Sequence, residues 1–157
     1  MPQFKTTKEL MAFVQKAIDK SLTEDVYPVI VDEEIEAIDR VVYTYKAKGS
    51  YKRRMDKGGM GDPKNIVIKG GVAVGGTLIV ENITPANPYI NGFNMSDGLS
   101  DTDKDLPSVI ESGYGYDYWM SATPRRFTQR TINALLASGA CTIALKKGLI
   151  KQGISVI

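Results

Sequence analysis

Two stretches near the start of the chain carry apolar residues at helical spacing. The first stripe consists of Leu10, Phe13, Val14, Ala17 and Ile18. It follows a segment from Thr6 to Glu9 that matches the S/T-x-x-E capping box, so we predict a helix from about residue 7 to about residue 20. We predict a second helix from about Thr23, as its cap, to about Asp39, with Pro28 tolerable only near its first turn.

The pattern then changes to β-branched and aromatic residues. The stretch 41–45 predicts a strand, and the basic, glycine-rich stretch 46–64 predicts a long loop. Apolar runs at 66–68 and 72–74 precede Gly75-Gly76, and another run follows at 77–80. This arrangement predicts a tight hairpin, with a bulge at Gly70-Gly71. A second long loop is expected over 82–105.

The last third of the chain predicts a short helix over 106–111, ended by Gly113, and a longer one that opens with Thr123 as cap and Pro124 at its first position. Its expected buried residues are Phe127, Ile132, Leu135 and Leu136, continuing after an interruption at Gly139 with Ile143, Leu145 and Leu149. A final short strand is expected over 154–157.

These elements predict an α+β fold in which a small antiparallel sheet packs against two N-terminal helices and one C-terminal helix, with long loops. The chain has 157 residues, the length of one ordinary domain. We expect a single domain over 1–157, with helices over about 7–39, sheet and loops over about 41–120, and the C-terminal helix over about 124–150.

The amino-acid composition excludes several classes of catalytic and metal site. The chain has one cysteine and no histidine, so Ser-His-Asp and Cys-His nucleophile pairs are impossible, as is a four-cysteine metal site. A net charge of +2 is too mild to indicate nucleic-acid binding by itself. No stretch reaches the length of a membrane-spanning helix, and no signal peptide is read at the start. We therefore expect a protein made in the cytoplasm.

Four candidate sites favour plain structural interpretations. The acidic stretch 101–105 begins like a calcium loop but has Leu106 in place of the turn glycine. The glycine pairs lack the Lys-Ser/Thr and helix of a phosphate loop. Glu33 with Glu36, or Asp32 with Glu36, fits a solvated helix face, and a small core residue is the usual role for a cysteine such as Cys141. We expect no enzyme activity, no cofactor and no metal.

The basic stretch 46–57 leaves three alternatives open. Its cations, with Tyr45 and Tyr51 interleaved, fit a solvated loop, a nucleic-acid contact, or a contact with carboxylates of an adjacent subunit such as those of the second helix.

Three ordered blocks carry a family resemblance. The first block comprises the segments 42–45, 51–54 (Tyr51-Lys52-Arg53-Arg54) and 58–66, which begins Gly58-Gly59-Met60-Gly61-Asp62-Pro63. The second block is the segment 106–116, and the third is Pro124-Arg125-Arg126-Phe127. In this order they resemble a family of small virion proteins of tailed phages, encoded among head–tail joining genes as minor structural, neck or tail-completion proteins. The family often has Pro-Arg-Pro-Phe where this chain has Pro124 to Phe127, so the contact made there differs.

The resemblance implies a ring-forming neck or tail-completion subunit, in the virion, between the portal or connector and the tail tube. Its partners would be copies of itself in a hexameric or dodecameric ring and other neck, connector and tail-tube proteins, with contact to DNA in the channel left open. Alternatives are a nucleic-acid-binding accessory protein that uses 46–57 and a minor capsid-associated protein. Candidate contact residues are Tyr45, Tyr51, Arg53, Arg54, Asp62, Glu111, Tyr116, Arg125, Arg126 and Phe127.

Overall fold

The computed structural model of the chain describes residues 4–44, 55–85, 89–90, 93–94, 106–113 and 123–156. Helices account for most of these residues and the strands are short, which confirms the predicted α+β class. The chain divides into two compact units. Unit 1 comprises Met1–Glu33, Val67–Glu81 and Asn133–Ile157, and unit 2 comprises Glu34–Ile66 and Asn82–Ile132. The single-domain organisation stays a prediction.

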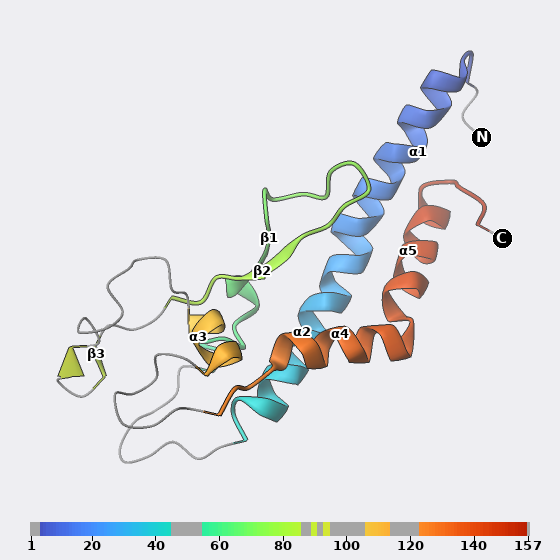
Figure 1. The fold of residues 1–157 in the computed structure, drawn as a ribbon. Helices are drawn as coiled ribbons and strands as arrows, with labels where there is room; N and C mark the ends of the chain where they lie inside the picture. The colour runs from blue at the N-terminus through green and yellow to red at the C-terminus, as the bar shows by residue number, and fades with distance from the viewer. Residues whose placement is uncertain are drawn as a thin grey trace. The chain divides into compact units, whose positions relative to one another are not determined.

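The elements follow one another along the chain as Figure 1 shows. They are α1 (Thr7–Ser21), the π-helical segment η1 (Leu22–Val26), α2 (Tyr27–Val41), the 3-10 helix η2 (Pro63–Asn65), β1 (Ile66–Ile68), β2 (Val80–Asn82), β3 (Tyr89–Ile90), β4 (Phe93–Asn94), α3 (Leu106–Ser112), α4 (Phe127–Ser138) and α5 (Ala140–Lys151). β1 pairs with β2, and β3 forms an antiparallel pair with β4 inside the stretch that was expected to be a loop.

The predicted cap at Thr6 is confirmed, but the reciprocal bond from the Glu9 carboxylate goes to the residue before the cap. The Thr6 hydroxyl accepts a hydrogen bond from the Glu9 amide at 3.2 Å, and the Glu9 carboxylate accepts one from the Lys5 amide at 2.8 Å. Two separate N-terminal helices were expected, but this is wrong, because α1 continues into α2 through η1. At that junction the Tyr27 amide bonds to the Leu22 carbonyl, one residue wider than in an α-helix. A π-helical turn directly before Pro28 fits a proline that cannot donate the next bond of the ladder.

In unit 1, the predicted hairpin is confirmed and its turn is docked on the helix. Gly75 and Gly76 both have positive φ, as a tight two-residue turn requires, and Val74 and Thr77 exchange backbone hydrogen bonds at 3.0 and 3.1 Å. The Asp19 carboxylate accepts hydrogen bonds from the Gly75 amide at 3.3 Å and the Gly76 amide at 2.7 Å. The Asp19 carboxylate on α1 therefore holds the turn by accepting hydrogen bonds from two backbone amides that would otherwise be unpaired.

The irregularity predicted at Gly70-Gly71 is present and is larger than a one-residue bulge. The Lys69 amide bonds to the Ile79 carbonyl at 2.9 Å, after which the next pairing is between Val74 and Thr77. Between these pairings the first arm advances by five residues and the second by two, so the first arm carries three extra residues. Positive φ at both Gly70 and Gly71 allows this excursion.

α5 packs closely against the end of α1 and against η1, also within unit 1 (Figure 1). The contact relies on small residues, because Ala144 and Gly148 are buried on α5 and Ala17 and Ser21 are buried on α1. A Cβ added at Gly148 would lie 2.6 Å from the Ser21 Cβ and 2.5 Å from an Asp25 carboxylate oxygen. The helices can approach this closely only because Gly148 has no side chain.

Unit 2 has its own apolar core. Its buried members are Ala37, Ile38, Val42, Met60, Ile110 and Phe127. The strand predicted over 41–45 is wrong as far as residue 44, because α2 runs to Val41 and residues 42–44 form a turn. The Val42 and Tyr43 amides both bond to the Ile38 carbonyl, and packing of Val42 in this core outweighs its preference for strands.

The C-terminal region confirms some predictions and corrects others. The short helix before Gly113 and the interruption at Gly139, whose φ is positive, are both confirmed. α4 begins at Phe127, so Thr123 and Pro124 lie before the helix and the predicted cap is wrong. The strand expected over 154–157 is absent from residues 154–156.

The predicted buried side of the C-terminal helix is only partly correct. Phe127 is buried, but Ile132 is exposed and Leu136 is 77% exposed. Among the described residues, eight of the eleven exposed large apolar side chains belong to unit 1. They are Leu10, Met11, Val72, Val74, Ile79, Leu136, Ile143 and Ile150. Unit 1 therefore presents much apolar surface to its surroundings.

The close contact at Gly148 predicts the effect of one methyl group. Gly148→Ala should lower the free energy of unfolding by about 1–3 kcal/mol, because Ser21 and Asp25 must move to admit the Cβ. An ordinary helix glycine would give the opposite result, since alanine is the better helix former by about 1 kcal/mol. Urea unfolding of the variant measures the change.

The exposed Thr142→Ser on the same helix serves as the control and should change the free energy of unfolding by less than about 0.5 kcal/mol. A Gly148→Ala protein as stable as wild type, or more stable, would contradict the packing described here.

Candidate functional site

The Gly58–Asn65 segment, which carries the resemblance, is an ordered loop folded onto unit 2. The Asp62 carboxylate accepts hydrogen bonds from the Gly58 amide at 2.8 Å and the Lys64 amide at 3.0 Å. The hydrogen bonds from Lys64 and Gly58 lower the pKa of Asp62. The Gly59 carbonyl accepts from the Asn65 side chain at 2.8 Å and from the Thr84 hydroxyl at 3.3 Å. Asp62 therefore shapes the loop from within.

The loop buries Met60 in the core of unit 2. Both the amide and the carbonyl of Met60 form hydrogen bonds with side chains. The Met60 amide donates to the Tyr43 hydroxyl at 3.1 Å, and its carbonyl accepts from the Asn82 side chain at 3.0 Å. Met60 is 1% exposed, so these bonds replace water that cannot reach the backbone.

The Asn82 amide also holds a buried carboxyl group. It donates to Glu34 at 3.0 Å, and Glu34 on α2 is only 9% exposed. Burial raises the pKa of Glu34, the hydrogen bond from Asn82 opposes this rise, and the nearby charge of Glu111 adds to it. Sequence reasoning missed this group and chose other acidic residues of the same helix, although Glu34 stands in helical register with Ile38 and Val41 on the inward side of α2.

Glu111 has a second role at the start of α4. Its carboxylate accepts a hydrogen bond from the Thr128 amide at 3.1 Å, in the first turn of that helix. A carboxylate at a helix N-terminus satisfies a free donor and interacts favourably with the helix dipole. The side chain that satisfies this donor therefore comes from α3 rather than from the Thr123 that the sequence indicated.

The candidate contact residues fall into three groups. Asp62, Glu111 and Phe127 serve the interior of unit 2, as turn former, helix cap and core residue. Arg126 is exposed, and Arg125 is half-buried, with its guanidinium donating to the Val42 carbonyl at 3.4 Å. The others lie outside the described residues: Tyr45, Tyr51, Arg53, Arg54 and Tyr116. Contact of any of the ten with a partner stays a prediction.

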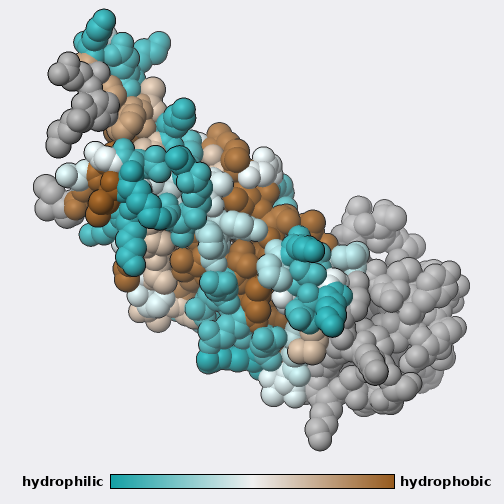
Figure 2. Space-filling view, turned by 180° about the vertical axis from the view of Figure 1, so that it is seen from behind, coloured by the Kyte–Doolittle hydropathy of each residue, from teal (hydrophilic) through white to brown (hydrophobic). Residues whose placement is uncertain are grey.

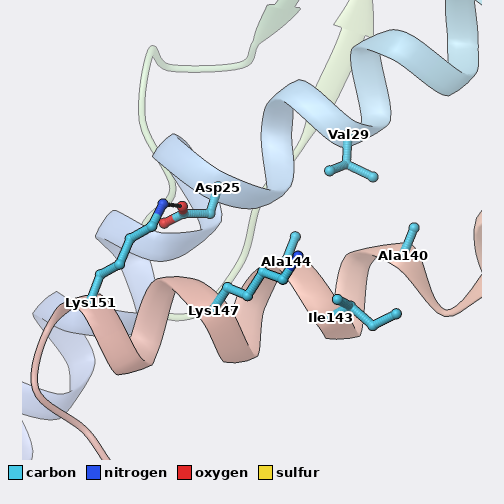
Figure 3. A pocket seen from close by; sticks show the side chains of 7 residues that line it. All are labelled: Asp25, Val29, Ala140, Ile143, Ala144, Lys147 and Lys151. Atoms are coloured by element: carbon cyan, nitrogen blue, oxygen red, sulfur yellow. Dashed lines mark hydrogen bonds and ion pairs between the residues drawn. The ribbon is translucent and has the colours of Figure 1, made fainter.

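Unit 1 contains an open groove of about 360 Å³ between α5 and the helix that starts at η1. Figure 3 shows Val29 facing α5 across the groove, and the Lys151 ammonium meeting the Asp25 carboxylate at one end. Ala140, Ile143 and Ala144 line it from α5, and Lys147 stands beside them. The lining is therefore mostly apolar, with one cation that forms no ion pair within the described part of the chain.

Two further observations concern reactive groups. Burial raises the pKa of the Cys141 thiol, which disfavours the thiolate that a nucleophile needs. Among the residues that the structure describes, no group of three or more Asp, Glu or Cys side chains could hold a metal ion, and the candidate calcium loop 101–105 lies outside them.

None of the helices that the structure describes combines the length and the hydropathy needed to cross a membrane.

The buried carboxyl predicts a pH dependence of stability. The pKa of Glu34 is raised in the folded protein above its ordinary value of 4.5. Above pH 4.5 the folded protein therefore holds this proton more tightly than the unfolded chain does. The free energy of unfolding then falls as the pH rises, so Glu34 costs stability. Glu34→Gln keeps an oxygen that can accept from Asn82 but carries no charge. The variant should therefore gain in Tm over wild type as the pH increases above 4.5, until the pH passes the raised pKa of Glu34 in the folded protein.

Thermal unfolding of both proteins across that pH range tests this, with Glu33→Gln, one position away and less buried, as the matched control. Parallel Tm curves for wild type and Glu34→Gln would show that the carboxyl is not desolvated.

The helix cap predicts a loss of stability. Glu111→Ala should lower the free energy of unfolding by about 0.5–2 kcal/mol, since the Thr128 amide loses its acceptor. Glu111→Gln, which keeps an acceptor oxygen, should lose less. Urea unfolding measures both variants, and equal stability of Glu111→Ala and wild type would refute the capping role.

Comparison with known proteins gives one family match. The sequence profile of a family described as YomN matches residues 6–151, which include every described helix and strand. No curated protein and no solved structure matches the chain. Because the profile covers far more than half of the sequence, the chain belongs to the YomN family, a phage-associated family.

Proposed function

We propose that this phage-associated protein is a structural subunit of the virion, a neck or tail-completion protein that assembles into a ring and joins the head to the tail. Its partners are then neighbouring copies of itself and the connector and tail-tube proteins on either side. The proposal assigns no catalytic residues and no cofactor.

The observation that carries the proposal is the exposed apolar surface of unit 1. A soluble monomer exposes single apolar side chains routinely, but several large ones on neighbouring elements are typical of an interaction surface. Here Met11 is 67% exposed on α1, and Ile143 is 52% and Ile150 60% exposed on α5, which contacts α1. Figure 2 shows apolar side chains at the surface among hydrophilic ones on one face of the molecule.

The buried polar groups support the same role. The Glu34 carboxyl, the Asn82 amide and the Met60 carbonyl satisfy one another, and so they fix the position of the glycine loop. An arrangement whose groups are mutually bonded and largely shielded from water suits a rigid subunit better than a substrate site, which needs an open cavity.

The resemblance of the three ordered blocks supplies the specific position in the particle. The Gly58–Ile66 block and the start of α3 are ordered parts of unit 2, so the similarity extends over structural features as well as surface residues. The exposed Arg126 stands where the family often has proline, next to the start of α4.

Analysis of particles tests the proposal. Mass spectrometry of purified virions should detect the chain in a small, fixed number of copies per particle. Phage that lack its gene should produce filled heads and separate tails. Absence of the chain from mature virions, or normal infectious particles without its gene, would overturn the proposal.

A further inference from the structure

Two oppositely charged features of unit 1 carry no partner within the described residues. On α5, Lys146 and Lys147 are exposed and form no ion pair there. On α2, Asp32 is exposed and Glu33 is half-buried, and neither belongs to an ion pair there. Each of these two helices therefore presents two neighbouring charged side chains that form no ion pair within the described residues.

The two lysines border an uncovered apolar stripe. Ile143 is 52% exposed and lies three residues before Lys146, and Ile150 is 60% exposed and lies three residues after Lys147. The spacing i, i+3, i+4, i+7 places the four side chains along one side of α5. This side is next to the groove, because Ile143 and Lys147 also line it.

The packing of α5 explains why this stripe is uncovered. α5 contacts α1 and η1 through Ala144 and Gly148, whose small size permits the close approach. Of the large apolar residues of α5, Leu145 and Leu149 are half-buried, whereas Ile143 and Ile150 remain exposed. A partner that lies along the groove would bury them.

The carboxylates of α2 are suited to that partner. Asp32 and Glu33 follow Val29 by one helical turn and so share its side of α2, which lines the groove in Figure 3. These two carboxylates match Lys146 and Lys147 in number and are opposite to them in charge. Because the acids lie on α2 and the lysines on α5, the α2 carboxylates of one copy can contact the α5 lysines of another.

We infer that this groove is the contact between copies of the chain: the α5 stripe of Ile143, Lys146, Lys147 and Ile150 in one copy receives the α2 turn of Asp32 and Glu33 in another. Burial of the isoleucines supplies attraction that does not depend on charge, and the lysine–carboxylate pairs set the register and exclude other orientations. This inference rests on the proposed self-assembly and names the surface that performs it.

Charge reversal tests the pairing without removing the apolar stripe. One variant carries Lys146→Glu and Lys147→Glu, and a second carries Asp32→Lys and Glu33→Lys. Each alone places like charges against each other and should move the oligomer to monomer at micromolar concentration, raising the apparent Kd by at least about 100-fold, which corresponds to about 2.7 kcal/mol. An equimolar mixture of the two variants restores opposite charges at every contact and should reassemble.

Native mass spectrometry and light scattering measure the three samples beside wild type. The far-ultraviolet circular dichroism of each variant confirms that it folds, since all four positions lie on helix surfaces. A Lys69→Glu variant, whose partner is Glu81 on the hairpin, is the matched control and should leave the oligomer unchanged.

The outcomes separate this inference from the proposed function. Wild-type oligomers that survive both reversals would overturn the groove contact while leaving a ring-forming subunit intact. Reversals that dissociate the oligomer without recovery on mixing would also overturn the pairing of these helices. A wild-type chain that stays monomeric at every concentration would overturn both.

Discussion

The close approach of α5 to α1 and η1 is the constraint from which the surface of unit 1 follows. It needs small side chains on both helices, and a Cβ at Gly148 would collide with Ser21 and Asp25. α5 therefore directs Ala144 and Gly148 inward and leaves Ile143 and Ile150 outside. These exposed isoleucines become buried only when a second surface covers the outer side of α5. For this reason we propose that this side takes part in assembly.

Unit 2 is organised by a different kind of interaction. Asn82 donates to both the Glu34 carboxyl and the Met60 carbonyl, so one side chain joins α2, the glycine loop and β2. Burying a carboxyl group is unfavourable unless it is hydrogen bonded or protonated, and the raised pKa of Glu34 reflects this cost. The same unit uses Glu111 to complete the first turn of α4. Both side chains therefore set the positions of loops and helix ends through their hydrogen bonds, although the charged form of Glu34 lowers stability.

Local signals predicted the parts of the fold that depend on local chemistry. The helix cap at Thr6 and the Gly75-Gly76 turn were predicted correctly because both are encoded within a few residues. The continuation of α1 into α2 was missed because the π-helical turn before Pro28 is a wider hydrogen-bond register with no simple pattern. The strand expected at Val42 was wrong because core packing outweighed its β propensity. The α4 cap was missed because Glu111 lies in another helix.

The candidate site was harder to predict, since it depends on contacts between distant residues. Asp62 and Phe127 were chosen as contact residues, yet one forms a turn and the other lies in the core. Nothing local distinguishes Glu34 from Glu33 except its register with Ile38. Exposure of Leu136 and Ile143 could not be foreseen, because an apolar stripe on a helix indicates burial without saying which molecule provides the cover.

Sedimentation equilibrium of the wild-type protein over a wide dilution series tests the central claim most directly. A chain of 17.2 kDa that works by assembly should show a mass that is an integral multiple of this value at micromolar concentration and that falls towards 17.2 kDa on dilution. A single species of 17.2 kDa up to about 100 μM, some two orders of magnitude above a micromolar Kd, would contradict the account.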